Sequence, residues 1–271
     1  MAIKFTAFGL FRSRRARSEL FVPSAPEGQR IYAVGDIHGR ADLLERLHQS
    51  ICEHATKGPA EITKTIVYLG DYVDRGFDSK GVIDFLLETR LQDFKSIYLK
   101  GNHEDMLLRF LEDPSIGPSW FAMGGNATAL SYGIRIPKGL SGTEKFQYIR
   151  QELLRLVPPD HLAFFSRLDL TFEAGDYFFV HAGIRRGVPL ERQRPHDLLW
   201  IRDEFLKRDH NCGKVIVHGH SISHRPEVRN DRIGIDTGAY ATNALTCLVI
   251  ESASRCFIST DASISATLTH G

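Results

Sequence analysis

Three short apolar segments near the start of the chain alternate with segments of helical periodicity. The apolar segments are Ile31–Val34, Thr65–Leu69 and Ser96–Leu99, and a glycine follows each of them at once or after one residue. Such segments are typical of buried strands. Apolar residues then recur at helical spacing within residues 41–55, 82–87 and 104–111. The alternation predicts βαβ units and an α/β fold in which helices cover the sheets.

Residues 113–167 have a different pattern, in which glycine and proline separate short helical patches. We expect a cap-like insertion of helices and loops over one edge of the sheet, not a separate domain. Strand patterns dominate after it, in residues 168–172, 177–180, 215–217, 233–235, 245–250 and 256–259, with one predicted helix at 196–208. A chain of 271 residues fits one large domain. The pattern places that domain at residues 29–265.

The composition is that of an ordinary globular protein, with 42% hydrophobic residues, 25% charged residues and a net charge of +1. The near-neutral charge argues against nucleic-acid binding. No apolar run approaches the roughly 20 residues of a transmembrane helix. The four cysteines, Cys52, Cys212, Cys247 and Cys256, are scattered without a C-x-x-C pair. This usage is typical of a reducing compartment and predicts a cytoplasmic location.

The start of the chain departs from this charge balance. Residues 1–20 hold five basic residues and one acidic residue, and the apolar stretch 5–11 precedes the arginines. A secretory signal has the opposite order. We therefore predict a basic, disordered arm over residues 1–28, and the alternative is a weak contact of this arm with a partner or a membrane surface.

Residues that can bind metal ions follow five of the predicted strands. They are Asp36 and His38 after the first strand, Asp71 after the second, Asn102 after the third, and His181 and His220 after two later strands. Ligands of α/β sheets bind at the carboxyl ends of the strands, so these side chains should converge. A single aspartate after a glycine is usually a turn residue or a helix cap, but five such strand ends favour a shared site. Oxygen and imidazole donors without thiolate suit Mn²⁺, Fe²⁺ or Zn²⁺, and six donors fit two ions.

The strings GDIHGR, GDYVDRG and GNHE, in that order, resemble the signature blocks of the phosphoprotein phosphatase family, within the calcineurin-like metallophosphoesterases. The later strings HAG, LLWIRDEF, HGHS and IDTGA are similar to the bacterial and phage serine/threonine phosphatases of that family. The resemblance runs from about Ile31 to Ile250. It implies an α-β-β-α sandwich and two divalent ions, for which we expect Mn²⁺, with Fe²⁺ or Zn²⁺ as alternatives.

The resemblance also implies a role for individual residues. Asp36 and His38 would bind the first ion, Asp71 would bridge both ions, and Asn102, His181 and His220 would bind the second. His103 would protonate the leaving oxygen, with Asp74 orienting its ring. Arg75 and Arg202 would hold phosphate oxygens. The alternatives to Arg202 are Arg185, Arg186, Arg192 and Arg194, which lie in the same region of the chain. Glu104 is expected to make a structural ion pair.

The expected function is that of a metal-dependent phosphomonoester hydrolase, specifically a serine/threonine protein phosphatase acting on phosphoproteins or phosphopeptides. Hydrolysis of dinucleoside polyphosphates is the alternative, because related enzymes use nearly the same metal blocks. Symmetrical enzymes of that kind tend to carry glutamine at the position of His38, which favours the phosphatase. A non-catalytic phosphate-binding module is a third hypothesis, and the presence of all six ligands argues against it.

Substrate choice is expected to lie in the 113–167 insertion, because loops on a rigid scaffold commonly carry binding residues. Trp120, Phe121 and Met123 could contact a substrate there, and the alternative is that they form a small core of the insertion. The tyrosine-containing loop that contacts substrate in eukaryotic members has no evident counterpart after the string IDTGA.

Overall fold

The structure is a computed structural model that describes residues 22–57, 61–89, 91, 93–210, 212–264 and 266–268. Most of the predicted basic arm, residues 1–21, lies outside the described residues. Residues 22–28 are held against the domain, since the Ser24 N–H donates to the Asp176 carboxylate at 2.9 Å and Ala25 is buried. The prediction of a disordered arm is therefore wrong for residues 22–28.

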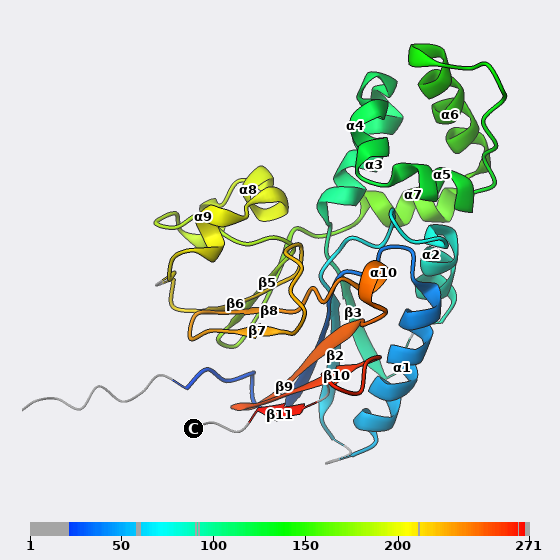
Figure 1. The fold of residues 1–271 in the computed structure, drawn as a ribbon. Helices are drawn as coiled ribbons and strands as arrows, with labels where there is room; N and C mark the ends of the chain where they lie inside the picture. The colour runs from blue at the N-terminus through cyan, green and yellow to red at the C-terminus, as the bar shows by residue number, and fades with distance from the viewer. Residues whose placement is uncertain are drawn as a thin grey trace, which may run out of the picture.

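Two sheets form the centre of the molecule (Figure 1). In chain order the strands are β1 (Gln29–Val34), β2 (Thr63–Tyr68), β3 (Phe94–Tyr98), β4 (Thr171–Ala174), β5 (Tyr177–Val180), β6 (Val215–His218), β7 (Glu227–Val228), β8 (Arg232–Gly234), β9 (Thr246–Glu251), β10 (Ser254–Ser259) and β11 (Ala266–Leu268). The first sheet has the order β11-β10-β9-β1-β2-β3 and the second the order β4-β5-β6-β8-β7. β1, β2 and β3 are parallel, as the βαβ pattern predicts.

The helices are α1 (Ala41–Ala55), α2 (Ser79–Glu88), α3 (Asn102–Glu112), α4 (Gly117–Ala122), α5 (Gly125–Ser131), α6 (Gly142–Leu156), α7 (Pro159–Ser166), α8 (Pro195–Trp200), α9 (Asp203–Leu206) and α10 (Ala239–Thr242), with short 3₁₀ turns at Pro114–Ile116 and Leu190–Arg192. The single helix predicted at 196–208 is wrong. Arg202 has φ −132° and ψ −100°, outside the helical region, and it separates α8 from α9.

Alternating side chains of the strands enter different cores. On β1, Tyr32 packs in the core beneath α1 and α2, whereas Ile31 packs in the core between the two sheets. On β5, Phe179 enters the core between the sheets and Phe178 enters a third core beneath α8 and α9. The layers therefore run helix, sheet, sheet, helix, which confirms the predicted α-β-β-α sandwich.

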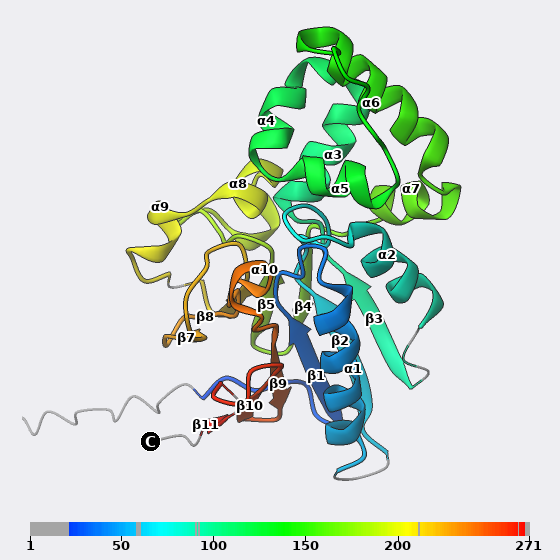
Figure 2. The same cartoon turned by 45° about the vertical axis from the view of Figure 1, so that its right-hand side comes forward.

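The predicted insertion is a group of helices, α4 to α7, that stands with α3 beyond the carboxyl ends of β1 and β2 (Figures 1 and 2). Its apolar side chains Trp120, Phe146 and Ile149 belong to the same core as the residues beneath α1 and α2. The insertion therefore extends the helical layer of the domain. Within the described ranges, no helix has both the length and the apolar character that crossing a membrane requires.

Candidate binuclear metal centre

The six metal-ligand candidates lie in buried loops directly after the strands. Asp36 and His38 follow β1, Asp71 follows β2, Asn102 begins α3 after β3, His181 follows β5 and His220 follows β6, and none is more than 4% exposed. Both sheets therefore contribute to one edge of the sandwich. Strand ends that lie far apart in the sequence meet there, as expected for this layered fold.

The backbone at this edge is strained. Seven non-glycine residues in the described ranges have positive φ angles, and five of them are His38, Asp71, Asp74, Arg75 and His220. Such conformations cost free energy of order 1–3 kcal/mol each and persist only where the surroundings fix them. The local strain therefore marks this edge as the functional part of the molecule. A Cβ on Gly101 would lie 2.1 Å from Asp71 Oδ1, so only glycine leaves room for that carboxylate.

One group of donor atoms gathers around His181 Nε2. This atom lies 2.9 Å from Asn102 Oδ1, 3.2 Å from His220 Nδ1 and 3.4 Å from Asp71 Oδ1. His181 Nδ1 donates to the Leu69 carbonyl oxygen at 2.8 Å, which leaves a lone pair on Nε2. Lone pairs of His181 and Asn102 thus face one another at 2.9 Å, an arrangement that a cation between them would stabilise.

A second group lies on the other side of Asp71. His38 Nε2 is 3.4 Å from Asp71 Oδ2, and His103 Nε2 is 3.8 Å from the same oxygen. His38 Nδ1 donates to the Val73 carbonyl oxygen at 2.9 Å, so its Nε2 also carries a lone pair. The two oxygens of Asp71 therefore face two different donor groups, the geometry needed for a carboxylate shared by two ions.

Asp36 lies beside these groups without belonging to either compact cluster. Its Oδ2 accepts the His220 backbone N–H at 3.0 Å, and its Oδ1 is buried without a hydrogen-bond partner. Burial, followed by the negative charges of Asp236 and Asp71, raises the pKa of Asp36 well above its usual range. A bound cation would satisfy the free oxygen and offset this repulsion.

The protonation of the cluster also fits metal ions. Burial lowers the pKa of His38 to about 3 and that of His220 to about 2, so both imidazoles are neutral at physiological pH. Burial opposes ionisation of Asp71, yet the surrounding histidines, led by His181, hold its pKa well below the usual range. Neutral imidazoles and an ionised carboxylate are the forms that bind metal. The residues present therefore fit two divalent ions.

His103 and Asp74 form a buried pair next to this cluster. His103 Nδ1 donates to Asp74 Oδ2 at 2.8 Å, and neither side chain is exposed. Burial opposes the charged form of His103, but the carboxylates of Asp71 and Asp74 outweigh it and raise the pKa of His103. The Nε2 atom of His103 has no hydrogen-bond partner in the described residues, so the pair can present a proton toward the cluster.

Two further carboxylates, Glu104 and Asp236, lie at this edge in surroundings that the sequence patterns did not predict. Glu104 accepts the backbone N–H groups of Gly101, Asp71 and Tyr72 at 2.9, 2.9 and 2.8 Å, so the expected ion pair is wrong and Glu104 fixes the Asp71 loop instead. Asp236 is buried beside Asp36, and its Oδ2 has no partner. Asp236 could have been predicted, because it follows the strand pattern at 233–235 as the metal-ligand candidates follow theirs.

Arg75 and Arg202 lie near different histidines of the cluster. The charge of Arg75 acts on His38, whereas that of Arg202 acts on His181 and His220, in each case adding to the effect of burial in lowering the histidine pKa. Arg202 is exposed and no described hydrogen bond holds its side chain.

Arg185, the first alternative to Arg202 as a phosphate-binding residue, forms ion pairs with Asp197 at 2.7 Å and with Glu204 at 2.9 Å. It is therefore a poor candidate for that role.

The sequence patterns also missed Tyr240, which lies in α10 directly after the string IDTGA. Its ring centre is 5.4 Å from that of His38, and the Arg75 guanidinium lies 5.0 Å above the ring. A tyrosine therefore borders the cluster at the position where none was expected. The one indication of Tyr240 in the sequence was its position five residues after the predicted strand at 233–235, which is too far from the strand end to suggest a residue of the site.

Trp120 is fully buried, and its Nε1–H donates to Asp74 Oδ2 at 3.2 Å. The hypothesis that Trp120 contacts a substrate is therefore wrong, because its indole is turned inward and stacks on Phe110 of α3 at a centroid distance of 4.5 Å. Phe121 and Met123 are half-buried against the same core. The alternative, that these residues form a core of the insertion, agrees with the structure.

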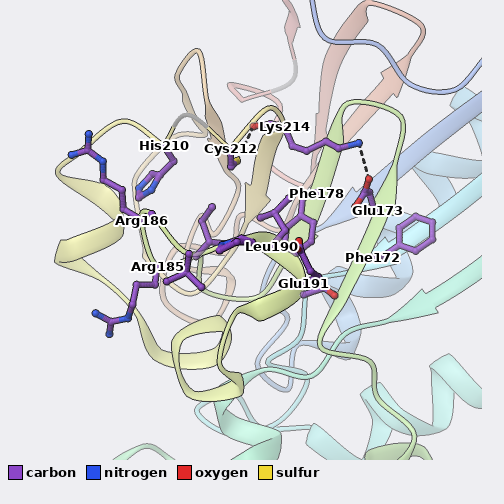
Figure 3. A pocket seen from close by; sticks show the side chains of 15 residues that line it. Phe172, Glu173, Phe178, Arg185, Arg186, Leu190, Glu191, His210, Cys212 and Lys214 are labelled. Atoms are coloured by element: carbon purple, nitrogen blue, oxygen red, sulfur yellow. Dashed lines mark hydrogen bonds and ion pairs between the residues drawn. The ribbon is translucent and has the colours of Figure 1, made fainter.

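A cavity of about 820 Å³ lies away from the cluster, on the outer side of the second sheet (Figure 3). Phe172, Phe178 and Leu190 supply apolar walls, and Lys214 at its rim pairs with Glu173 at 2.7 Å. None of the metal-ligand candidates lines this cavity. Chemical groups, not cavity size, therefore identify the functional site.

Comparison with known proteins agrees with this geometry. A family model described as calcineurin-like phosphoesterase matches residues 29–247. The chain belongs to this family. Its members are hydrolases built around two metal ions, and the two donor groups that share Asp71 are consistent with such a centre.

Individual relatives differ in the substrate that their names give. The chain is 26% identical, over 80% of its length and 87% of the relative's, to bis(5'-nucleosyl)-tetraphosphatase PrpE [asymmetrical] of Oceanobacillus iheyensis. It is 23% identical, over 67% of its length and 54% of the relative's, to Shewanella-like protein phosphatase 2 of Arabidopsis thaliana. Among solved structures, a proposed diadenosine tetraphosphatase matches with a TM-score of 0.59 and 21% identity, covering 89% of this chain and 95% of the other, which supports the fold.

Proposed function

We propose that this metallophosphoesterase hydrolyses dinucleoside polyphosphates, with phosphoprotein phosphatase activity as the second candidate. The observation that favours nucleotides is the aromatic border of the cluster. Tyr240 is 37% exposed beside His38, and Phe77 is 88% exposed two residues after Arg75. The likeness to a bis(5'-nucleosyl)-tetraphosphatase along most of both chains supports the same substrate class.

Both aromatic residues belong to segments that contact the metal-binding loops. The Asp78 N–H donates to the Gly39 carbonyl oxygen at 3.0 Å, which holds the Phe77 segment against the His38 loop. Arg40 in turn donates to the Ala239 carbonyl oxygen at 3.0 Å, which holds the start of α10. Exposed aromatic rings stack on nucleobases with about 1–3 kcal/mol per base. A base next to a polyphosphate at the cluster would be within their reach.

Different residues of the site would bind the metal ions, bind the phosphate and donate the proton. Two divalent ions, for which we propose Mn²⁺, supply an activated hydroxide and neutralise phosphate charge when bound. Asp36 and His38 would hold one ion, Asn102, His181 and His220 the other, and Asp71 both. Arg75 and Arg202 bind phosphate oxygens, because a planar guanidinium matches two oxygens at once. His103 donates a proton from Nε2 to the leaving oxygen, while Asp74 holds its Nδ1–H.

The second candidate has its own support in the pair of His103 and Asp74. A serine alkoxide is a poor leaving group and needs a proton, whereas a nucleotide phosphate leaves with little protonation. A buried proton donor is therefore most useful for phosphoserine or phosphothreonine substrates. The likeness to Shewanella-like protein phosphatase 2 also agrees with this candidate.

Product analysis separates the two candidates. We expect the Mn²⁺-loaded protein to convert diadenosine tetraphosphate to ATP and AMP, detected by chromatography, with a kcat/KM at least tenfold above that for a phosphoserine peptide. Replacing Tyr240 and Phe77 by alanine should raise KM for the dinucleotide and leave p-nitrophenyl phosphate turnover nearly unchanged. Phosphate release from the peptide without cleavage of the dinucleotide would instead establish the protein phosphatase.

A further inference from the structure

The Asp74 carboxylate is held by residues of the insertion. Its Oδ1 accepts the Thr128 hydroxyl at 2.6 Å, and its Oδ2 accepts Trp120 Nε1–H at 3.2 Å together with His103 Nδ1–H at 2.8 Å. All four side chains are completely buried. Each oxygen of Asp74 therefore has a donor from the insertion, and one oxygen also holds the imidazole of His103.

The backbone of the same segment is fixed by α5 and by the turn that precedes it. The Asp74 N–H donates to Thr128 Oγ1 at 2.8 Å, and the Arg75 N–H donates to the Gly124 carbonyl oxygen at 3.2 Å. Asp74 and Arg75 have φ angles of 69° and 68°, which are unfavourable for residues with side chains. A strained pair of residues persists only where its surroundings hold it. Here the insertion supplies that support together with the Ser79 hydroxyl of α2, which also accepts the Asp74 N–H, at 3.1 Å.

Two glycines allow this close approach. A Cβ on Gly124 would lie 2.8 Å from the Arg75 nitrogen, and a Cβ on Gly125 would lie 2.1 Å from the Trp120 ring. Side chains at these positions would push α5 away from Asp74 or displace the indole. The turn is therefore shaped to bring both Trp120 and Thr128 against one carboxylate.

We infer that Thr128 and Trp120 are positioning residues for proton transfer, which orient His103 through the carboxylate of Asp74. This inference rests on the proton-donor role of His103 proposed above. With both oxygens held, the carboxylate cannot rotate, and the imidazole keeps Nε2 directed at the cluster. Loss of the Thr128 hydroxyl leaves a buried carboxylate oxygen without its donor and frees Asp74 to turn. The insertion thus takes part in the chemical step, and its contribution is greatest for substrates whose leaving group needs a proton.

The test compares substrates that differ in their need for a proton. Thr128→Val removes the hydroxyl at nearly constant volume, and Thr128→Ser retains it. We expect Thr128→Val to lower kcat for phenyl phosphate about 10- to 100-fold, part of the about 10²–10⁴-fold contribution of general acid catalysis. For p-nitrophenyl phosphate, whose leaving group needs little protonation, kcat should fall less than about threefold. Thr128→Ser should restore both rates.

The controls separate a positioning role from a structural one. Thr143→Val makes the same chemical change at an exposed position of α6 and should alter neither rate. Metal content and Tm are measured for every variant, and Trp120→Phe, which removes the other donor, should show the same dependence on the leaving group with a smaller loss. If Thr128→Val does not fold, the same assay tests the inference with Trp120→Phe, which removes the other donor, and with Thr128→Ser as the variant that keeps the hydroxyl.

Two results would overturn the inference in distinguishable ways. If the folded Thr128→Val and Trp120→Phe variants lose activity equally on both substrates, or lose none, the two residues do not act through proton transfer. If His103→Asn also shows no dependence on the leaving group, the proposed proton donor itself is wrong. A leaving-group effect in His103→Asn without one in the Thr128 and Trp120 variants contradicts only the positioning role.

Discussion

At the scale of single residues, the centre depends on side chains whose two nitrogen or two oxygen atoms make different contacts. His38 and His181 donate Nδ1–H to backbone carbonyl oxygens and keep Nε2 for the cluster. Asp71 likewise turns one oxygen toward each donor group. Such backbone contacts fix the tautomer and the direction of a ligand before an ion arrives. The site is thus organised by the chain itself.

Replacing His103 by asparagine tests its role at this scale. His103 is not a metal-ligand candidate, so metal content measured by mass spectrometry should be unchanged. Its kcat for phenyl phosphate should fall by about 10²–10⁴-fold, and the loss should be smaller for p-nitrophenyl phosphate. Asp160→Asn, at an exposed position of α7, serves as a control for general effects of substitution. An equal loss on both substrates would show that His103 does not act as the acid.

The metal-ligand candidates were predictable at this scale because each directly follows a buried strand, so a short-range pattern reports a position in space. The same rule would have found Asp236. The contacts of Trp120 and Thr128 with Asp74 were not predictable, because they join residues that are 46 and 54 positions apart through the packing of an insertion. Short-range periodicity contains no information about that packing.

At the scale of elements, helices are tied to the sheet by buried polar contacts as well as by apolar packing. His48 on α1 lies against β2, where the Tyr68 hydroxyl contacts His48 Nε2 at 2.7 Å. Periodicity predicted α1 at 41–55 correctly, because its buried positions Leu43, Leu44, Leu47 and Ile51 repeat at helical spacing. It could not predict the break between α8 and α9, because Leu198 and Phe205 keep apolar spacing across the irregular backbone at Arg202.

His48 should make the stability of the domain depend on pH. Burial lowers the pKa of His48 to about 4, whereas the unfolded chain has the ordinary value near 6.5. Between pH 4 and pH 6.5 the unfolded state binds more protons at His48 than the folded state does. The contribution of the neutral His48 to the unfolding free energy is therefore fully present above about pH 6.5 and is lost as the pH falls toward 4. His48→Gln should remove about 2 kcal/mol of the decrease in unfolding free energy between pH 7 and pH 5.

Urea unfolding at the two pH values measures this change. His224→Gln, at an exposed position, is the matched control and should leave the pH dependence as it is. If His48→Gln loses as much stability on acidification as the unmodified protein, another group titrates and the assignment to His48 is incorrect.

At the scale of the whole molecule, the sandwich places five strand ends from two sheets at one edge. Neither sheet alone supplies a full set of donors, since Asp71 comes from the first sheet and His181 and His220 come from the second. Sequence patterns predicted the layers, but the order of the strands depends on long-range pairing such as that of β9 beside β1. Metal ions at this edge should therefore hold the two sheets together.

Removal of metal should lower the stability of the domain. A ligand that binds only the folded state adds about 2.7 kcal/mol at a free concentration 100 times its Kd, which corresponds to a Tm shift of roughly 5–10 °C for a domain of this size. We expect Tm to fall by that amount after treatment with EDTA and to recover with Mn²⁺. An unchanged Tm in protein shown to lose its metal would contradict a role of the ions in joining the sheets.

The most direct test of the account is electron paramagnetic resonance of the Mn²⁺-loaded protein at low temperature. The central claim is that Asp71 is shared by two ions at the meeting point of the two sheets. We predict two Mn²⁺ per chain and the spectrum of an exchange-coupled pair, and we predict that Asp71→Asn loses the coupled spectrum and its phosphoesterase activity together. A fully active protein with a single, uncoupled Mn²⁺, or a coupled and active Asp71→Asn variant, would contradict the claim.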